Sequence, residues 1–483
     1  MRHLLRSRRP SPLASTPTAP RSGKAGTDRP TRFRDVFASG EFRALYAAST
    51  LSWLGDYIAR AAITAMVFDL TRSIAASAAA FAISFAPWLL GGSVLVSIAE
   101  RYPYRQVMVW CDIARMVIMV AIAALSTSVP LAALLALLLL SSLFTPPFDA
   151  ARSATLPAVL GPDRYVTGVA INTATTPPTQ ITGYFLGASL ATVNPRLALL
   201  INAATFGLSA VLVRTAVRAR EPALSHERRT GLLRETGDGF RLVFTNPALR
   251  ALVLLVFCGS LFAVVPEGLG AAWAAREPDG LSRAWAQGVI MGAVPLGLVL
   301  GSLVVSRLVP PARRRALLRP LALATPLALV PTAFDPPTKV VAALALVSGF
   351  AMGALVPVAN GQFVQALPNA YRARAFGVVS AGLQLLQGAA VLATGALAMR
   401  VDLPRVVGLW SLAGVLLMIV LITTWPSPQA FANAGAKAAA MNAASAAVQA
   451  PSPVSPAPRR GLMAVIGAAR RRNGQPHAGT MEP

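Results

Sequence analysis

The chain has few charged residues for its length. Of its 483 residues, 13% are charged and 55% are hydrophobic, whereas a soluble globular protein carries about 25% charged residues. Apolar runs of about 20 residues, the length needed to cross the hydrocarbon core of a bilayer, recur along the sequence. This composition excludes an ordinary soluble enzyme and predicts a protein whose apolar surface faces lipid.

Cysteine, histidine and lysine are also scarce. The cysteines are Cys111 and Cys258, both in apolar runs, and the three histidines all lie outside such runs. Neither their number nor their spacing fits a disulfide framework or a metal site. Only three lysines are present, and Gly23-Lys24 is followed by Ala25, so the phosphate-binding loop of an ATPase is missing. We therefore predict no metal, no cofactor and no enzymatic activity.

The net charge of +25 comes from basic residues in short loops and tails. They do not form one patch with interleaved aromatics, so a nucleic-acid partner is not expected. With the N-terminus placed inside, the tails and the loops on that face hold 35 of the 44 Lys and Arg residues, and the opposite face holds 7. Because such a bias marks the cytoplasmic side of a membrane protein, both termini are expected to be cytoplasmic.

Twelve apolar segments are predicted to be transmembrane helices. They cover residues 42–68, 74–98, 107–127, 130–148, 165–191, 196–216, 250–272, 285–306, 317–333, 339–360, 373–399 and 405–425. The longest internal hydrophilic stretch separates the first six from the last six, so the expected fold is an all-α integral membrane protein with two six-helix bundles. The predicted organisation is a disordered basic tail (1–40), an N-terminal bundle (41–217), a cytoplasmic linker (218–249), a C-terminal bundle (250–425) and a second disordered tail (426–483).

The two halves show a weak internal repeat. Arg307 follows the eighth segment and lies 206 residues after Arg101, which follows the second segment. Gln387 in the eleventh segment lies 207 residues after Gln180 in the fifth. A nearly constant offset between matching segments indicates parallel repeats, and transporters built from such repeats bind substrate near the bilayer midplane, between the bundles.

Several short motifs carry a family resemblance. They are Gly55-Asp56, Thr71-Arg72-Ser73, Glu100-Arg101 with Arg105, Asp112-x-x-Arg115, Ala151-Arg152 through Leu156-Pro157, and Gln180-x-x-Gly183. Over residues 40–425 the chain resembles the major facilitator superfamily, and within it the bacterial efflux branch that includes siderophore and macrolide exporters. In the fifth segment Gly183 is followed by Tyr184, where the family's antiporter motif has proline. The resemblance implies a monomer in the bacterial cytoplasmic membrane that binds a small-molecule substrate.

Five charged residues lie inside the apolar segments: Asp56, Arg60, Asp112, Arg115 and Glu267. On insertion scales each such residue costs about 2.5–3.5 kcal/mol at a helix centre, so these side chains are expected to face the bundle interior and to have partners. We predict that they serve proton coupling or gating.

Asp112 and Arg115 lie three residues apart on one helix face near its cytoplasmic end. Two interpretations stay open for them. They form a static ion pair that holds helices together, or they meet the loop motif of Glu100, Arg101 and Arg105 and make a cytoplasmic latch.

Asp56 and Arg60 share a face of the first helix because they are four residues apart. The repeat offset carries Arg60 onto Glu267, and the family resemblance implies that helices 1 and 7 both line the cavity. We expect Arg60 to pair with Glu267 across the halves when the outer gate is closed, and with Asp56 when it opens. Asp56 is the leading proton-coupling carboxylate, because an Arg partner that moves away changes its proton affinity.

Polar residues in the helices are candidates for the substrate cavity or for hydrogen bonds between helices. They are Asn172, Gln180, Asn202, Asn360, Gln384 and Gln387. Glycines spaced four apart, such as Gly297 with Gly301 and Gly349 with Gly353, predict close helix packing.

The sequence therefore predicts a secondary transporter, and proton-coupled efflux of a small hydrophobic or amphiphilic compound is the first hypothesis. An importer or symporter of the same fold is the second. The third is a membrane scaffold or sensor that does not transport, which would gain little from intramembrane charges.

Overall fold

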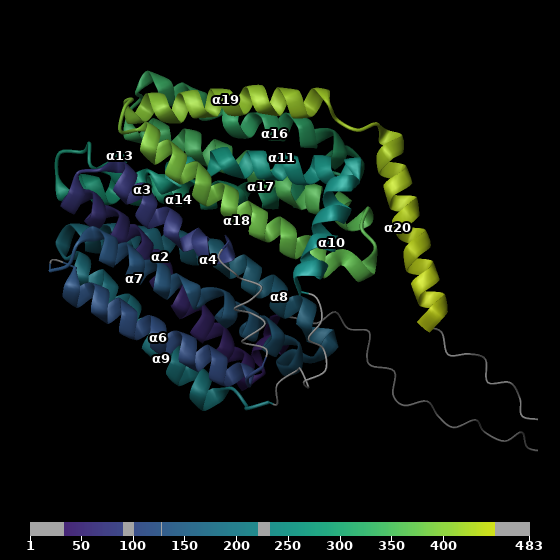
Figure 1. Cartoon of the computed structure of the whole chain (residues 1–483), viewed down its shortest axis with the longest axis horizontal. Helices are drawn as coiled ribbons and strands as arrows, with labels where there is room; N and C mark the ends of the chain where they lie inside the picture. The colour runs from purple at the N-terminus through teal and green to yellow at the C-terminus, as the bar shows by residue number, and fades with distance from the viewer. Residues whose placement is uncertain (1–32, 90–100, 127, 221–231, 450–483) are drawn as a thin grey trace, which may run out of the picture.

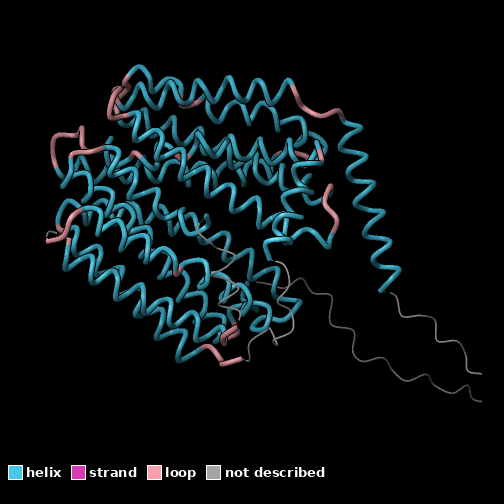
Figure 2. Tube along the Cα trace, viewed as in Figure 1, coloured by secondary structure: helices cyan, strands magenta, loops and turns pink. Residues whose placement is uncertain are grey.

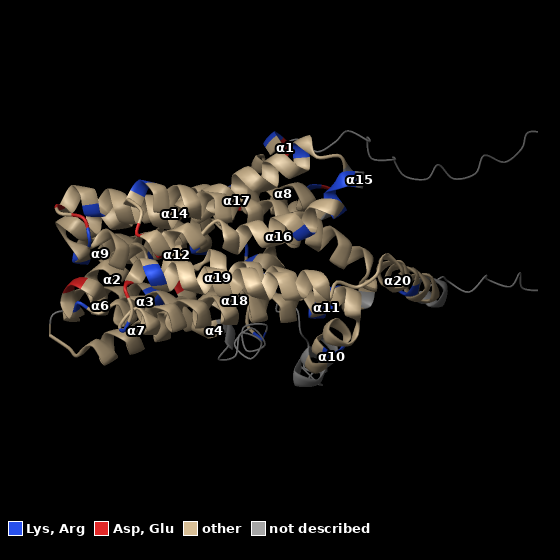
Figure 3. Ribbon diagram, turned by 90° about the horizontal axis from the view of Figure 1, so that it is seen from above, with Lys and Arg blue, Asp and Glu red and all other residues tan. Residues whose placement is uncertain are grey.

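A computed structural model describes residues 33–89, 101–126, 128–220 and 232–449. These residues form helices and no strands, and the loops lie mainly at the two ends of the molecule (Figure 2). Lys, Arg, Asp and Glu gather toward those ends, whereas the middle of the molecule is mostly uncharged (Figure 3). This distribution is that of a protein whose middle lies in hydrocarbon.

The N-terminal half comprises α1 (Phe33–Phe37), α2 (Gly40–Thr71), α3 (Ile74–Ala82), η1 (Ile83–Phe85), α4 (Ala86–Leu89), α6 (Tyr104–Leu125), α7 (Leu131–Leu143), α8 (Thr145–Val193) and α9 (Pro195–Ala216). The C-terminal half comprises α11 (Pro247–Ala263), α12 (Val265–Gly268), α13 (Gly270–Ala274), α14 (Gly280–Leu308), α15 (Pro311–Arg314), η2 (Arg315–Leu317), α16 (Leu318–Leu327), η3 (Val330–Phe334), α17 (Thr338–Gln365), η4 (Asn369–Tyr371), α18 (Arg372–Leu397) and α19 (Leu403–Thr423). Helix α10 (Leu232–Thr245) precedes this half, and α20 (Pro428–Gln449) follows it.

The two halves lie side by side, with the C-terminal half above the N-terminal half in the view of Figure 1. Each half has apolar clusters of its own. A further cluster joins Phe81 and Tyr184 of the N-terminal half to Trp273 and Val391 of the C-terminal half. The halves therefore share a packed seam, at the end of the molecule where α2 ends and α14 begins.

The predicted helices are confirmed in large part. Among the described residues, nine helices are long and apolar enough to cross a membrane. The remaining predicted spans correspond to α2, to the second part of α8, and to the shorter apolar helix Ile74–Phe85, whose predicted continuation over 90–98 lies outside the described residues. Close packing at the spaced glycines is also confirmed, because a side chain at Gly297 or Gly301 would collide with the backbone of α17.

Two helices differ from their predicted form. The fourth predicted helix was expected to end at residue 148, but the helix continues to Gly161, where φ of +70° breaks α8 into two spans. Glycine adopts this left-handed conformation without the penalty that a Cβ imposes. The seventh helix is broken at Val264–Leu269, where Pro266 lacks a backbone N–H and Gly268 weakens the helix. Glu267 therefore lies on a single short turn, α12, between α11 and α13.

The expectation of disorder over 426–483 is wrong for Pro428–Gln449, which form α20. This segment is rich in alanine, the residue with the highest helix propensity. Trp425 stacks on Phe431 with 5.7 Å between ring centroids, and the backbone N–H of Asn369 donates to Asn442 Oδ1 at 2.8 Å. In the first tail, Phe33–Phe37 form α1, whereas 1–32 and 450–483 lie outside the described residues.

Candidate functional site

A cavity of about 410 Å³ lies between the two halves. Its walls come from α2, η1 and α8 on one side and from α11, α12, α14, α17 and α18 on the other. Aromatic rings of Trp53, Tyr57 and Phe85 share this lining with charged and amide side chains. Ligand sites of about 300–1,000 Å³ with an apolar wall and a few polar groups are typical for small molecules.

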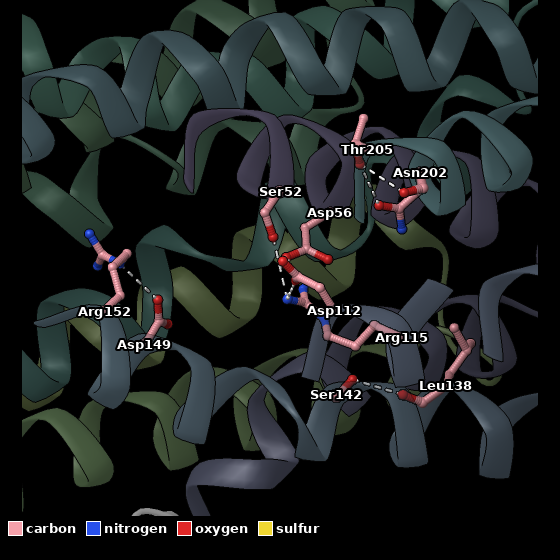
Figure 4. A network of polar contacts seen from close by, with 10 residues as sticks. All are labelled: Ser52, Asp56, Asp112, Arg115, Leu138, Ser142, Asp149, Arg152, Asn202 and Thr205. Atoms are coloured by element: carbon pink, nitrogen blue, oxygen red, sulfur yellow. Dashed lines mark hydrogen bonds and ion pairs between the residues drawn. The ribbon is translucent and has the colours of Figure 1, made fainter. Parts of the chain in front are cut away.

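Arg115 is the centre of a charged network in the N-terminal half (Figure 4). Its Nη2 lies 2.5 Å from Asp56 Oδ2 on α2, and its Nη1 lies 3.7 Å from Asp112 Oδ1 on its own helix, α6. The guanidinium also lies 3.9 Å from the centroid of the Phe206 ring on α9. Because the side chain is only 2% exposed, its charge is compensated by these partners and not by bulk water.

Asp56 pairs with Arg115 in the described structure, and the predicted exchange of Arg60 from Glu267 to Asp56 when the outer gate opens stays a prediction. Sequence spacing on one helix favoured Arg60, but the side chain of Arg115 reaches across from α6. The static interpretation of Asp112 and Arg115 agrees with their 3.7 Å contact and their burial. The alternative, a cytoplasmic latch, includes Glu100, which lies outside the described residues.

The remaining loop-motif residues lie away from this network. Arg105 donates to the backbone oxygen of Val217 at 3.3 Å, which ties the start of α6 to the end of α9. Arg101 is exposed at the end of the bundle.

Arg60 faces Glu267 across the halves, but the expected direct ion pair is not formed. Tyr184 lies between them: its hydroxyl accepts from Arg60 Nη1 at 3.5 Å and donates to Glu267 Oε1. Gln180 Nε2 donates to the same Glu267 oxygen at 3.1 Å. The Arg60 guanidinium lies 5.4 Å from the ring centroid of Tyr57. A hydroxyl bridge therefore replaces the predicted salt bridge.

Asp149 is a site residue that sequence reasoning missed. It lies on α8 in the cavity wall, and its Oδ1 is 3.5 Å from Arg152 Nε. The Arg152 guanidinium lies 4.7 Å from the ring centroid of Trp53. Asp149 follows directly after the predicted end of the fourth helix, so it was treated as a loop residue.

The six polar candidates lie in three different places. Gln180, Gln384 and Gln387 line the cavity. Asn202 is fully buried beside the charged network, and its Oδ1 accepts from Thr205 Oγ1 at 3.4 Å. Asn172 on α8 is half-buried and Asn360 on α17 is exposed, and both lie outside this lining.

Gln287 of α14 closes the seam at one end of the cavity. Its Nε2 donates to the backbone oxygen of Ala61 on α2 at 2.7 Å and lies 3.4 Å from Thr64 Oγ1. Next to it, Gly288 packs against the ring of Phe185 on α8. The site is thus a cavity between the halves with charges on both of them and a sealed seam at one end.

A comparison with protein-family models identifies the family to which this fold belongs. The family model described as Major Facilitator Superfamily matches residues 45–387. The chain belongs to this superfamily. It is a multi-pass membrane transporter, and its role is transport and not catalysis.

Several solved transporter structures share the fold of this superfamily member. The nucleoside transporter NupG is 15% identical, with a TM-score of 0.63, over 80% of this chain and 99% of that one. A POT family transporter in complex with 5-aminolevulinic acid is 12% identical, with a TM-score of 0.63, over 80% and 96%. A bacterial homologue of the human lysosomal transporter Spinster, in an inward-facing and unoccupied conformation, is 13% identical, with a TM-score of 0.56, over 84% and 96%. At these identities the likeness shows the fold alone. A comparison with curated proteins gives no match.

Proposed function

We propose that this transporter exports a small hydrophobic or amphiphilic compound, such as a drug, a siderophore or a secondary metabolite, in exchange for protons. The cavity supports this class of substrate, because its aromatic walls suit an apolar body and its amides suit a polar end. Alternating access would come from rocking the two halves about the cavity.

The observation that carries the coupling proposal is a charge imbalance in and beside the cavity wall. Four carboxyl groups and three guanidinium groups gather there: Asp56, Asp112, Asp149 and Glu267 with Arg60, Arg115 and Arg152. With all seven ionised, three positive and four negative charges leave a net charge of −1. Uptake of one proton would neutralise the set, and a neutral set is favoured in a low-dielectric interior.

Asp56 is the carboxylate best suited to take that proton. Its side chain is 30% exposed and lines the cavity, whereas Asp112 is fully buried. Both carboxylates share the Arg115 guanidinium. A proton on Asp56 would release the guanidinium toward Asp112, so α2 would separate from α6 more easily. Deprotonated Asp56 would recapture Arg115 and restore the contact.

Glu267 would pass this change to the other half. It accepts from Tyr184 and Gln180 of α8 while it belongs to α12, so protonation of its carboxyl would weaken a bond between the halves. In this scheme the bridge from Arg60 through Tyr184 to Glu267 is the gate element.

We further propose that the protein lies in the bacterial cytoplasmic membrane as a monomer with both termini cytoplasmic. Helices α1 and α20 lie at the same end of the bundle (Figure 3), as an even number of spans requires. The excess of Lys and Arg in the loops and tails assigned to that end supports the cytoplasmic assignment.

Transport assays with intact cells test the proposal. A panel of amphiphilic compounds should leave loaded cells faster when the protein is overproduced, and an uncoupler should abolish the difference. Faster uptake in place of efflux would identify an importer, and no flux of any compound would favour a scaffold.

The coupling step is tested separately in proteoliposomes with an imposed pH gradient. Asp56→Asn should abolish gradient-driven transport but preserve substrate exchange at equal pH, because asparagine resembles the protonated carboxyl and cannot release or take up a proton. Asp69→Asn is the matched control, since Asp69 lies on the same helix and is exposed. Gradient-driven transport that survives in Asp56→Asn would contradict the assignment.

A further inference from the structure

An apolar groove runs along the outside of the seam between the halves. Ile181 and Phe185 of α8 form one wall, the stretch of α14 from Trp285 to Leu296 forms the floor, and α17 forms the other wall. Its volume is about 370 Å³, similar to that of the central cavity, but its lining is apolar except at one end. The groove therefore faces the hydrocarbon of the bilayer and not the aqueous path.

The polar end of the groove is Lys339, the second residue of α17. Its Nζ lies 5.9 Å from the ring centroid of Trp285, which is 43% exposed. No carboxylate in the described part of the chain lies within 4.0 Å of this ammonium. Tryptophan and lysine at a helix start are typical of the level where lipid headgroups lie.

The length of the groove matches one leaflet. From Trp285 to Leu296 the chain advances eleven residues, or about 16 Å of helix. Half of a hydrocarbon core is about 15 Å. A groove that begins at a lone cation at headgroup level and ends near the midplane is complementary in shape and charge to an anionic lipid.

We propose that this groove is a binding site for one acyl chain of an anionic phospholipid, with the phosphate on Lys339. The chain would cover the outside of the seam where Phe185 packs on Gly288, while Gln287 seals its inside. The site is separate from the substrate cavity, so it does not depend on the direction of transport or on the coupled ion.

The test uses the full chain in nanodiscs of phosphatidylcholine that contain phosphatidylglycerol with brominated acyl chains. Bromine quenches tryptophan at short range, and subtraction of the Trp285→Phe spectrum isolates the emission of Trp285. Brominated phosphatidylglycerol should quench this emission at about a fivefold lower mole fraction than brominated phosphatidylcholine, as expected for one basic residue at the membrane surface.

Two sets of variants locate the two parts of the site. Lys339→Gln should abolish the preference for phosphatidylglycerol and Lys339→Arg should keep it, while Arg400→Gln removes a charge at the same end of the molecule outside the groove. Ala343→Phe fills the groove at an exposed position and should reduce quenching by both lipids. Ala136→Phe, on the exposed face of α7, is its control.

Three results would overturn the proposal. The first is equal quenching by the two lipids in the wild-type protein. The second is an equal loss of preference in Lys339→Gln and Arg400→Gln, which would indicate diffuse surface charge. The third is unchanged quenching in Ala343→Phe, which would place the bound chain outside the groove.

Discussion

Replacement of Arg115 by methionine is the most informative perturbation of the charged network. Methionine keeps an unbranched stem but ends short of the guanidinium that lies over Phe206, so the change removes the charge and this ring contact together. The change leaves Asp112 at 0% exposure with no guanidinium, and it leaves Asp56 without its 2.5 Å partner. Removal of one partner from a buried ion pair destabilises a protein by about 3–5 kcal/mol, because the remaining charge is buried alone.

The size of the effect depends on which partner is removed. Asp112→Asn should cost about 1–2 kcal/mol, because Arg115 keeps its contact with Asp56 and only the more distant carboxylate is lost. The double variant of Arg115→Met with Asp112→Asn should be more stable than Arg115→Met alone, since no buried carboxylate remains on α6. Arg72→Gln is the control: Arg72 and Asp69 are 70% and 54% exposed, and such pairs contribute about 0–1 kcal/mol.

Reversible unfolding in mixed micelles, followed by the loss of helical circular dichroism, measures these differences. A loss below about 1 kcal/mol for Arg115→Met, equal to that of an exposed pair, would refute the reasoning. So would a double variant whose loss equals the sum of the single losses, because additivity would mean that the two side chains do not interact.

Two further predictions concern polar contacts outside the charged network. Gln287→Leu removes the buried donor to the Ala61 oxygen. The loss of one hydrogen bond of about 0.5–1.5 kcal/mol should shift the equilibrium between closed and open seam roughly two- to tenfold toward the open form. Longer spin-label distances between α2 and α14 would measure this shift. At Asp335 the hydrogen bond from Arg276 lowers the pKa of the carboxyl, so the pair stabilises the fold above the ordinary Asp pKa of about 3.9 and loses this effect as the pH falls through the lower folded value. Between pH 6 and pH 3 the free energy of unfolding of Asp335→Asn should therefore change less than that of the wild type. The difference should be under about 1 kcal/mol, because both partners are partly exposed.

The spans were predictable because the bilayer imposes them. A predicted segment at 405–425 becomes α19 at Leu403–Thr423, and one at 196–216 becomes α9 at Pro195–Ala216. Every backbone polar group in hydrocarbon needs an internal partner, so long apolar runs have little choice but to be helical. The helix ends follow from local chemistry, such as the side chain of Asn194 that accepts from the backbone N–H of Arg196.

The ion pairs were not predictable to the same degree. Spacing on one helix identifies neighbours such as Asp112 and Arg115, but it cannot show that a side chain from another helix approaches more closely. Arg115 reaches Asp56 across 59 positions of sequence, and helix spacing gave no sign of this contact. Asp149 was missed for a related reason, because the predicted helix ended at residue 148, directly before it, whereas the helix continues to Gly161.

The internal repeat predicted more of the site than residue spacing on one helix did. Its offset led from Arg60 to Glu267, and the two side chains do face each other across the seam. The repeat could not predict Tyr184, which lies between them, because no spacing in the sequence links this tyrosine to Arg60 or Glu267. A phenol hydroxyl accepts from a guanidinium and donates to a carboxylate at the same time. It can therefore hold the two halves together without a direct ion pair, and it can release them when the Glu267 carboxylate is protonated. The residue that departs from the family's Gly-Pro motif in the fifth predicted helix thus takes part in joining the halves.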